Sequence, residues 1–141
     1  MKKNNKNYSY GAILFRKEKN VIYILLVKHK QGHWGIPKGH REKNEKIVDT
    51  IKREVFEETG INNFTFIKNK HLIENYNFKD GNVTIKKQVK YYLCEVKNKK
   101  INIQFKNEII KCKWFESIKS ITQATHESTK NLLKNFNKII H

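Results

Sequence analysis

The pattern of apolar and polar positions along the chain predicts a series of β-strands. Residues 21–27 form a continuous apolar run rich in β-branched side chains, which is typical of a strand buried on both faces. Residues 101–105 alternate with a period of two, which predicts a further strand. Residues 17–20 are expected to turn, and Asp80-Gly81 is a strong hairpin signal. The predicted strands cover residues 8–15, 21–27, 64–74, 85–96, 101–105 and 109–115.

Apolar residues recur at helical spacing in two other segments. In the first segment, Asn44 is the expected N-cap and Gly60 is the residue that stops the helix. A capping-box pattern of Ser120 and Gln123 predicts an additional short helix. This order of elements suggests a mixed sheet covered by a helix on each face. The two apolar stripes consist of Ile47, Val48, Ile51 and Val55, and of Leu132, Leu133, Phe136, Ile139 and Ile140.

Three glutamates share one face of the first predicted helix. Glu54, Glu57 and Glu58 stand at positions i, i+3 and i+4, one turn apart. Like charges at this distance repel each other by on the order of 1 kcal/mol per pair even in water. A helix shaped by stability alone would not carry them, whereas a hard cation such as Mg²⁺ takes oxygen ligands and makes them favourable. The spacing therefore predicts a site for a divalent cation.

A rigid loop runs into the N-terminus of this helix. It contains three glycines and the only proline of the chain: Gly32, Gly35, Pro37 and Gly39. Glycine permits close approach of the backbone, proline stiffens the chain, and the start of a helix offers N–H groups to an anion. Within the helix, Arg53 is placed to reach back to a carboxylate such as Glu45 and to fix the loop.

Seven residues of the loop and helix match the signature of the Nudix hydrolases, which this chain resembles. They are Gly39, Glu45, Arg53, Glu54, Glu57, Glu58 and Gly60. The flanking pieces His33-Trp34 and Pro37-Lys38-Gly39-His40 are similar to those of the asymmetrical diadenosine tetraphosphate hydrolases. The resemblance covers nearly the whole chain, more weakly outside the motif. It implies an α/β fold, the Nudix-type α/β/α sandwich with a mixed β-sheet.

The resemblance also implies roles in metal-dependent hydrolysis of a phosphoanhydride. The implied ligands of Mg²⁺, or of Mn²⁺ in its place, are Glu54, Glu57, Glu58 and Glu108. Either Glu57 or Glu108 would take the proton of the attacking water, and Arg53 is carried over as a catalytic position. Taken alone, Glu108 reads more readily as a solvated loop residue, and its spacing to Trp114 is what favours the functional role.

Further residues are implied as contacts to the substrate. For the polyphosphate these are His33, Lys38, Gly39 and His40, although the histidines could equally cap loop carbonyls. Tyr76 stands where relatives stack an aromatic ring on adenine, and its alternative is packing on the sheet edge. The opposing aromatic of relatives falls at His126, a departure that leaves the second half of the adenine clamp open.

Length and composition narrow the classes of protein. A chain of 141 residues with 38% hydrophobic residues is expected to form a single domain over residues 1–141. The net charge of +17 favours polyanions, but only three of the 30 basic residues are arginines and the lysines are spread out, so most are interpreted as solvated surface. Cys94 and Cys112 are expected as free thiols in the cytoplasm. No membrane span, signal peptide or obligate protein partner is evident.

Three hypotheses about function result. The first is a pyrophosphohydrolase of dinucleoside polyphosphates, for which the resemblance implies cleavage of diadenosine tetraphosphate to ATP and AMP. The second is removal of pyrophosphate from the 5′ end of triphosphorylated RNA, which suits the charge, although relatives of that kind often have Gln where Lys38 stands. The third, from another class, is a non-catalytic Nudix module that binds nucleotides or RNA. Such a module need not keep Glu54, Glu57 and Glu58.

Overall fold

A seven-stranded mixed sheet forms the centre of the structure, a computed structural model that describes residues 5–104 and 106–140. β1 (Lys6–Glu18) and β6 (Val83–Glu95) run parallel, and the other paired strands run antiparallel. The order is β3-β2-β1-β6-β5, with β4 also paired to β1 and β7 to β2. The other strands are β2 (Val21–His29), β3 (Trp34–Gly35), β4 (Lys38–Gly39), β5 (Thr65–Asp80) and β7 (Ile109–Glu116).

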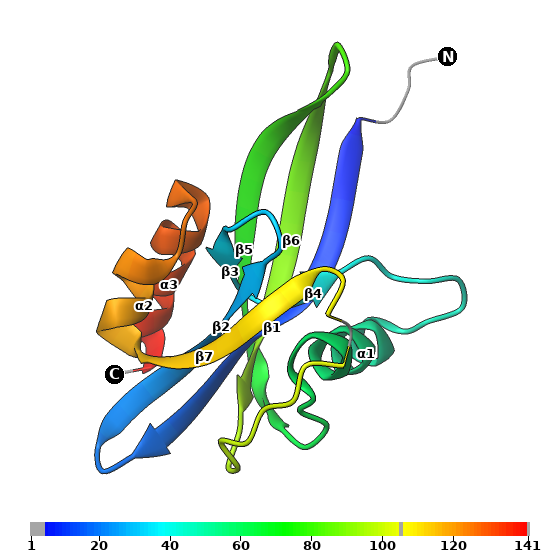
Figure 1. The fold of residues 1–141 in the computed structure, drawn as a ribbon. Coiled ribbons are helices and arrows are strands. Elements are labelled where there is room, and N and C mark those ends of the chain that lie inside the picture. Colours follow the sequence, from blue (N-terminus) through cyan, green and yellow to red (C-terminus); the bar gives the residue numbers. More distant parts are fainter. Residues whose placement is uncertain (1–4, 105, 141) are drawn as a thin grey trace.

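Helices cover both faces of this sheet, as Figure 1 shows. The helices are α1 (Ile47–Thr59), which covers one face, and α2 (Ser117–Gln123) and α3 (Glu127–Ile140), which cover the other. Successive residues of a strand point to opposite faces, so β1 contributes to two separate cores. Ile13 and Phe15 pack in the core that contains α3, whereas Ala12 and Leu14 pack in the core that contains α1. The layers confirm the predicted α/β/α sandwich.

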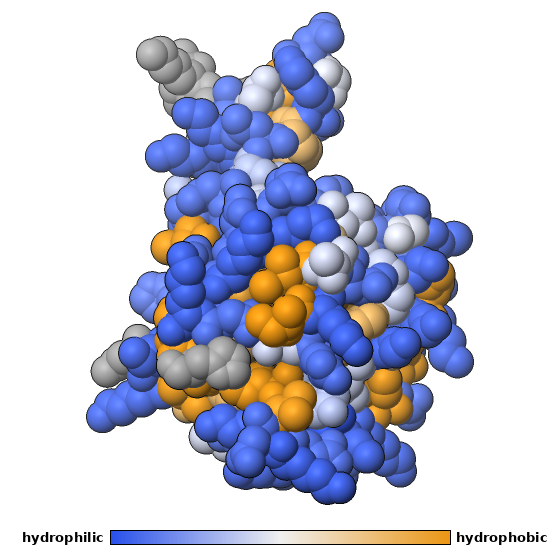
Figure 2. Space-filling view, turned by 90° about the vertical axis from the view of Figure 1, so that its left-hand side faces the viewer, coloured by the Kyte–Doolittle hydropathy of each residue, from blue (hydrophilic) through white to orange (hydrophobic). Residues whose placement is uncertain are grey.

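Most predicted strands are present, and several are longer than expected. The turn between β1 and β2 places Lys19 and Asn20 at φ values of 49° and 66°, and Gly81 turns the β5–β6 hairpin at φ 62°. This hairpin stands out from the body of the molecule at the top of Figures 1 and 2. β5 continues to Asp80, so Tyr76 lies on a strand and its direction is fixed by the alternation of the strand.

The start of α1 differs from the prediction. Lys46, and not Asn44, is the N-cap, and its backbone N–H donates to Asp49 Oδ2 at 3.2 Å. Asn44 has a φ of 68° and lies in the preceding turn. The reason is Glu45, whose carboxylate accepts from the Glu42 backbone N–H at 2.8 Å and so holds residues 42–45 outside the helix. Gly60 ends the helix as predicted, at φ 75°, with its N–H donating to the Phe56 carbonyl.

Two other predictions about secondary structure are wrong. Residues 101–104 form no strand, and Phe105, the last residue of that prediction, lies outside the described residues. Their backbone donors bond to the end of α1 instead, Asn102 N to Thr59 O at 2.8 Å and Gln104 N to Glu57 O at 3.1 Å. Ser120 caps no helix. It is buried inside α2, where its hydroxyl donates to the Ser117 carbonyl.

The surface on the side of α2 and α3 is mostly hydrophilic, with apolar patches between the polar side chains (Figure 2). Within residues 5–104 and 106–140, no helix has the length and apolar character needed to cross a membrane. Cys94 and Cys112 are buried free thiols.

Candidate active site

Arg53 holds the glycine loop and the carboxylates of α1 together. Its guanidinium donates to Glu45 at 2.7 and 3.0 Å, which is the contact that the sequence predicts. It also donates to Glu54 Oε1 at 2.8 Å and to the His40 carbonyl at 3.0 Å, and it lies 3.6 Å from Glu57 Oε2. The hydrogen bond from Arg53 lowers the pKa of Glu45 to about 2. One planar cation therefore fixes the loop and orients two members of the glutamate face.

Gly39 is required by the position of the Glu54 carboxylate. β4, which contains Gly39, pairs with β1 and passes directly over the side chain of Glu54. A Cβ atom at position 39 would overlap the carboxylate carbon and both of its oxygens. The glycine of the motif therefore leaves the space that this carboxylate occupies.

The glutamate face is crowded with negative charge. Glu58 is 7% exposed, and burial raises its pKa well above the ordinary value, with the charge of Glu54 as the next cause. Burial also raises the pKa of Glu54, against the opposing hydrogen bond from Arg53. The charge of Glu108, in the loop before β7, is a smaller cause of both increases. Glu54, Glu57 and Glu58 therefore share α1, and Glu108 acts on two of them through its charge.

These residues suit a hard divalent cation by their chemistry. Carboxylate oxygens are the ligands that Mg²⁺ prefers, and a bound cation would favour the ionised form that burial and mutual repulsion disfavour. In the part of the chain that the structure describes, no three His, Cys, Asp or Glu side chains converge closely enough to enclose a metal ion. Arg53 draws Glu54 and Glu57 towards itself, so occupation of the site would require these side chains to turn.

A cavity of about 460 Å³ lies beside the carboxylates and contains most of the predicted substrate contacts. Lys38 connects the two: its backbone N–H donates to Glu58 Oε2 at 3.1 Å, and its Nζ donates to the Tyr76 hydroxyl at 2.9 Å. The Lys38 ammonium also lies 5.0 Å from the Tyr76 ring centroid. The residues that line the cavity are His29, His33, Gly35, Ile36, Lys38, Glu74, Tyr76, Asn77, Phe78, Tyr91, His126, Glu127, Ser128 and Thr129.

Three imidazoles stand together on the wall of this cavity. His33 stacks on His29 with ring centroids 4.1 Å apart, and His126 is tilted against His33 at 5.3 Å. Burial is the main cause that lowers the pKa of His29, to about 4, and it lowers the pKa of His33 as well. His29 is therefore neutral at neutral pH and can accept or donate a hydrogen bond without carrying charge.

His40 lies apart from the histidines of the cavity. Its Nε2 is 2.9 Å from Asn7 Oδ1 and 3.0 Å from Lys87 Nζ. Lys87 is 7% exposed, and burial, followed by the charge of Lys38, lowers its pKa to about 8. The structure thus gives His40 three polar neighbours: Asn7 and Lys87 at its ring, and Arg53 at its backbone carbonyl.

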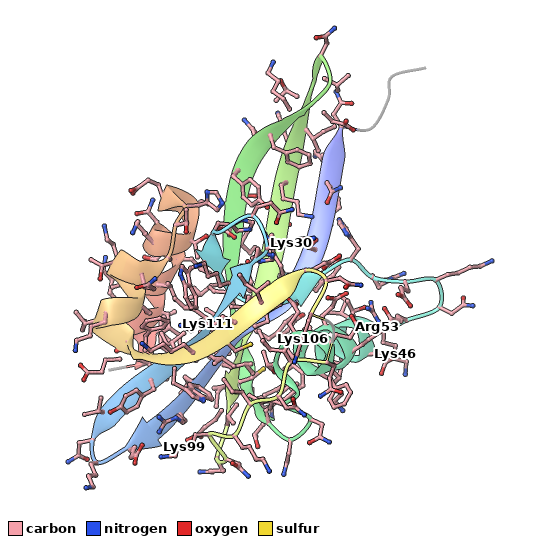
Figure 3. The ribbon with its side chains drawn as sticks, in the orientation of Figure 1. Lys30, Lys46, Arg53, Lys99, Lys106 and Lys111 are labelled. Carbon is pink, nitrogen blue, oxygen red and sulfur yellow. The ribbon has the colours of Figure 1, made fainter. Side chains whose placement is uncertain are left out.

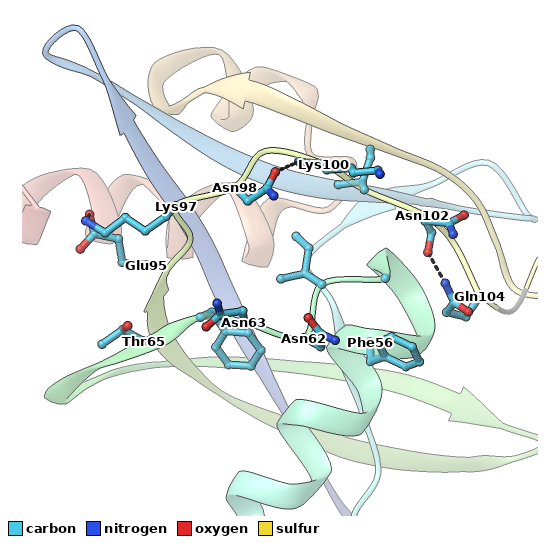
Figure 4. A pocket seen from close by; sticks show the side chains of 14 residues that line it. Phe56, Asn62, Asn63, Thr65, Glu95, Lys97, Asn98, Lys100, Asn102 and Gln104 are labelled. Atoms are coloured by element: carbon cyan, nitrogen blue, oxygen red, sulfur yellow. Dashed lines mark hydrogen bonds and ion pairs between the residues drawn. The ribbon is translucent and has the colours of Figure 1, made fainter.

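A second cavity, of about 520 Å³, lies at the C-terminal end of α1 (Figure 4). Amide side chains such as Asn62, Asn102 and Gln104 line it together with Phe56. Of the residues that the sequence assigns to the site, only Gly60 belongs to its lining, so this larger cavity is separate from the carboxylates.

Cationic side chains are distributed over the molecule. Lys46 and Arg53 belong to the α1 region, Lys111 lies on β7, and Lys99 lies in the loop that follows β6 (Figure 3). This spread agrees with the interpretation of most lysines as solvated surface.

Several residues of the site were missed in the sequence. Lys87 could not be distinguished among the many lysines, although it pairs across strands with Tyr76. Glu74 and Phe78 stand two residues before and after Tyr76, so strand alternation through position 78 would have placed all three on one face. The predicted strand stopped at residue 74, and that signal was lost.

Comparisons with known proteins show what this chain is similar to. The family model of the NUDIX domain matches residues 6–136. The asymmetrical bis(5′-nucleosyl)-tetraphosphatase of Rattus norvegicus is 30% identical over 83% of this chain and 91% of its own length. The m7GpppN-mRNA hydrolase of Saccharomyces cerevisiae is 31% identical over 84% of this chain, but over only 11% of its own length.

Solved structures show the same fold. The Ap4A hydrolase of C. elegans, solved as a binary complex, superposes with a TM-score of 0.82 at 27% identity, over 94% of this chain and 96% of that one. The family model covers nearly the whole chain, and the matching structure has the same fold over 94% of this chain. The chain therefore belongs to the Nudix family.

Proposed function

We propose that the protein hydrolyses dinucleoside polyphosphates, with diadenosine tetraphosphate as the preferred substrate and ATP and AMP as the products. The observation that carries this proposal is the bridging position of Lys38 between Glu58 and Tyr76. It joins the carboxylates, where phosphate chemistry would occur, to a cavity of the size and composition of a nucleotide pocket. The rat relative, whose name describes this activity, supports the same substrate class.

The residues of the chain would divide the work of the reaction. Glu54, Glu57, Glu58 and Glu108 would hold Mg²⁺ or Mn²⁺. The bound cation supplies charge neutralisation for the phosphates and lowers the pKa of water. Lys38 would neutralise phosphate oxygens of the substrate, and Glu57 or Glu108 would accept the proton of the attacking water. Arg53 would act as a positioning residue through Glu54 and the His40 carbonyl.

Magnesium should raise the melting temperature, by more at high pH than at low pH. A cation that binds only the folded protein stabilises it by mass action. Because Glu54 and Glu58 have raised pKa values, the metal-free folded state binds protons more tightly than the unfolded chain, and these two groups cost stability as pH rises through that range. At higher pH the metal competes with fewer protons at these two carboxylates, so the shift should grow as pH rises through their raised pKa values. Thermal melting with magnesium and with EDTA at each pH measures this, and an absent or downward shift contradicts the carboxylate site.

Tyr76→Ala should weaken binding of a non-hydrolysable diadenosine tetraphosphate analogue far more than binding of inorganic polyphosphate. Base–aromatic stacking contributes roughly 1–3 kcal/mol per base, which is a loss of about ten- to a hundredfold in affinity. Tyr76→Phe is the matched control, because it keeps the ring and removes the hydroxyl that accepts from Lys38. His126→Phe should bind equally or better. Calorimetric titration measures all three, and normal binding by Tyr76→Ala would mean that adenine stacks elsewhere.

Triphosphorylated RNA is the second candidate substrate. The net charge of +17 favours it, and a yeast relative is named for another RNA 5′ end, m7GpppN-mRNA. RNA would be held mainly through its phosphates, so its turnover should depend little on Tyr76 and strongly on salt. Measuring kcat/KM for both substrates side by side decides between them. Turnover of neither substrate would favour a non-catalytic binding module.

We also propose that this activity operates in the cytoplasm. Both cysteines are buried free thiols, and burial raises the pKa of each to about 12. Thiols of this kind are typical of a reducing compartment.

A further inference from the structure

The cavity beside Tyr76 has a buried carboxylate in its wall. Glu74 is 3% exposed, and its oxygens accept three hydrogen bonds from hydroxyl groups. The donors are Tyr91 to Oε1 at 3.1 Å, and Ser128 and Thr129 to Oε2 at 2.7 Å each. All four residues line the cavity. Burying a charge is expensive unless it is well bonded, and here a dedicated set of hydroxyls surrounds it.

This arrangement fixes the direction in which the three hydroxyl hydrogens around Glu74 point. A hydroxyl has one hydrogen and two lone pairs, and an ionised carboxylate has only lone pairs. Tyr91, Ser128 and Thr129 each give their hydrogen to Glu74, so what they can offer to a ligand is a lone pair. Among the described residues, only Tyr91 donates to Oε1 of Glu74, so this oxygen retains acceptor capacity. This part of the cavity wall, Glu74 with its three hydroxyl partners, can therefore accept hydrogen bonds from a ligand but has none to donate.

The acceptor wall stands next to the proposed stacking ring. Glu74 and Tyr76 are two residues apart on β5, so their side chains leave the same face of the strand. Their Cα atoms are separated by about 7 Å, twice the rise of a strand residue. A base stacked on the Tyr76 ring would therefore turn one edge towards Glu74.

We propose that Glu74, with its three hydroxyl partners, makes this cavity selective for nucleobases that present a hydrogen-bond donor, specifically the 6-amino group of adenine. This inference rests on the proposed function, because it takes the cavity as the nucleobase site. Hypoxanthine has a carbonyl oxygen where adenine has its amino group, so at the 6-position an acceptor faces Glu74. Its donor on this edge is the ring N1–H, which reaches Glu74 only if the stacked base shifts. Glu74 also connects β5 to the first turn of α3 through these hydrogen bonds. A purely structural contact needs no buried charge, because apolar residues stabilise such a contact equally well or better.

The test compares ATP with ITP by calorimetry, and diadenosine with diinosine tetraphosphate by kcat/KM, on the full-length protein. The wild type should prefer the adenine compound by about ten- to a hundredfold, the range of a hydrogen bond to a charged group. Glu74→Gln keeps the volume but adds an amide donor that can pair with the 6-oxo group, so most of the preference should disappear. Glu116→Gln is the control. It removes an exposed carboxylate that lies outside this cavity and should leave the preference unchanged.

The outcomes separate this inference from the proposed function. If both dinucleotides are cleaved equally well and ATP and ITP bind equally, Glu74 does not select the base, while the hydrolase function stands. If neither dinucleotide is cleaved but ATP binds more tightly than ITP in a manner that requires Glu74, the base selectivity holds and the proposed substrate fails. A preference for adenine that persists in Glu74→Gln, with melting temperature unchanged, overturns the assignment to Glu74.

Discussion

Glu57→Gln is expected to lower the rate of diadenosine tetraphosphate hydrolysis by ~10²-fold or more while the protein remains folded. Removing one group that stabilises charge in a transition state commonly costs this much. Folding should be little affected, because Glu57 is partly exposed and its ion pair to Arg53, at 3.6 Å, is a long one. Removal of its charge also reduces the repulsion that contributes to the raised pKa of Glu54.

Steady-state hydrolysis with magnesium, together with thermal melting, measures both effects. Asp49→Asn is the control on the same helix, because this carboxylate accepts from the Lys46 backbone and lies outside the glutamate face. It should keep the wild-type rate. Wild-type turnover by Glu57→Gln would remove this residue from the reaction.

Gly39→Ala is expected to abolish most activity. The substitution leaves the Glu54 side chain chemically unchanged but displaces its carboxylate. The added Cβ would overlap the Glu54 carboxylate, which must turn away because the backbone of β4 is held in the sheet. The loss should approach the ~10²-fold of a deleted charge-stabilising group. The fold should survive, because the displaced atoms are the end of a flexible side chain.

The melting shift produced by magnesium tests this mechanism directly. Gly39→Ala should lose much of the shift, since one carboxylate has moved. Gly35→Ala is the matched control, because a Cβ at position 35 meets no atom within 4 Å, and it should keep the full shift. A full magnesium shift and normal rate in Gly39→Ala would show that Glu54 is not needed where the structure places it.

The helix and its glutamates could be predicted because their spacing is a local property of one element. Positions i, i+3 and i+4 share a face in any α-helix, and Gly60 ends a helix wherever a left-handed residue is needed. The start of the helix was less predictable. Asn44 is a good cap by type, but the bonds of the Glu45 carboxylate to Glu42 and Arg53 decide where the helix begins.

Non-local contacts account for what the sequence did not show. Residues 101–105 alternate as a strand would. The described part of this segment nevertheless pairs with no strand, and its backbone N–H groups donate to carbonyls at the end of α1. The polar wall around Glu74 joins β5, β6 and α3, which are far apart in sequence. Lys87 is recognisable only by its burial beside Asn7 and Ser9.

The most direct test of the account is the identity of the products formed from diadenosine tetraphosphate. The full-length protein is incubated with this substrate and magnesium, and the nucleotides are separated by anion-exchange chromatography over time, with EDTA as the control. The account predicts ATP and AMP in equal amounts, formed only when the cation is present. Formation of two molecules of ADP would contradict it, and so would products that form equally fast in EDTA. Cleavage of triphosphorylated RNA by a protein that leaves diadenosine tetraphosphate intact would contradict it as well.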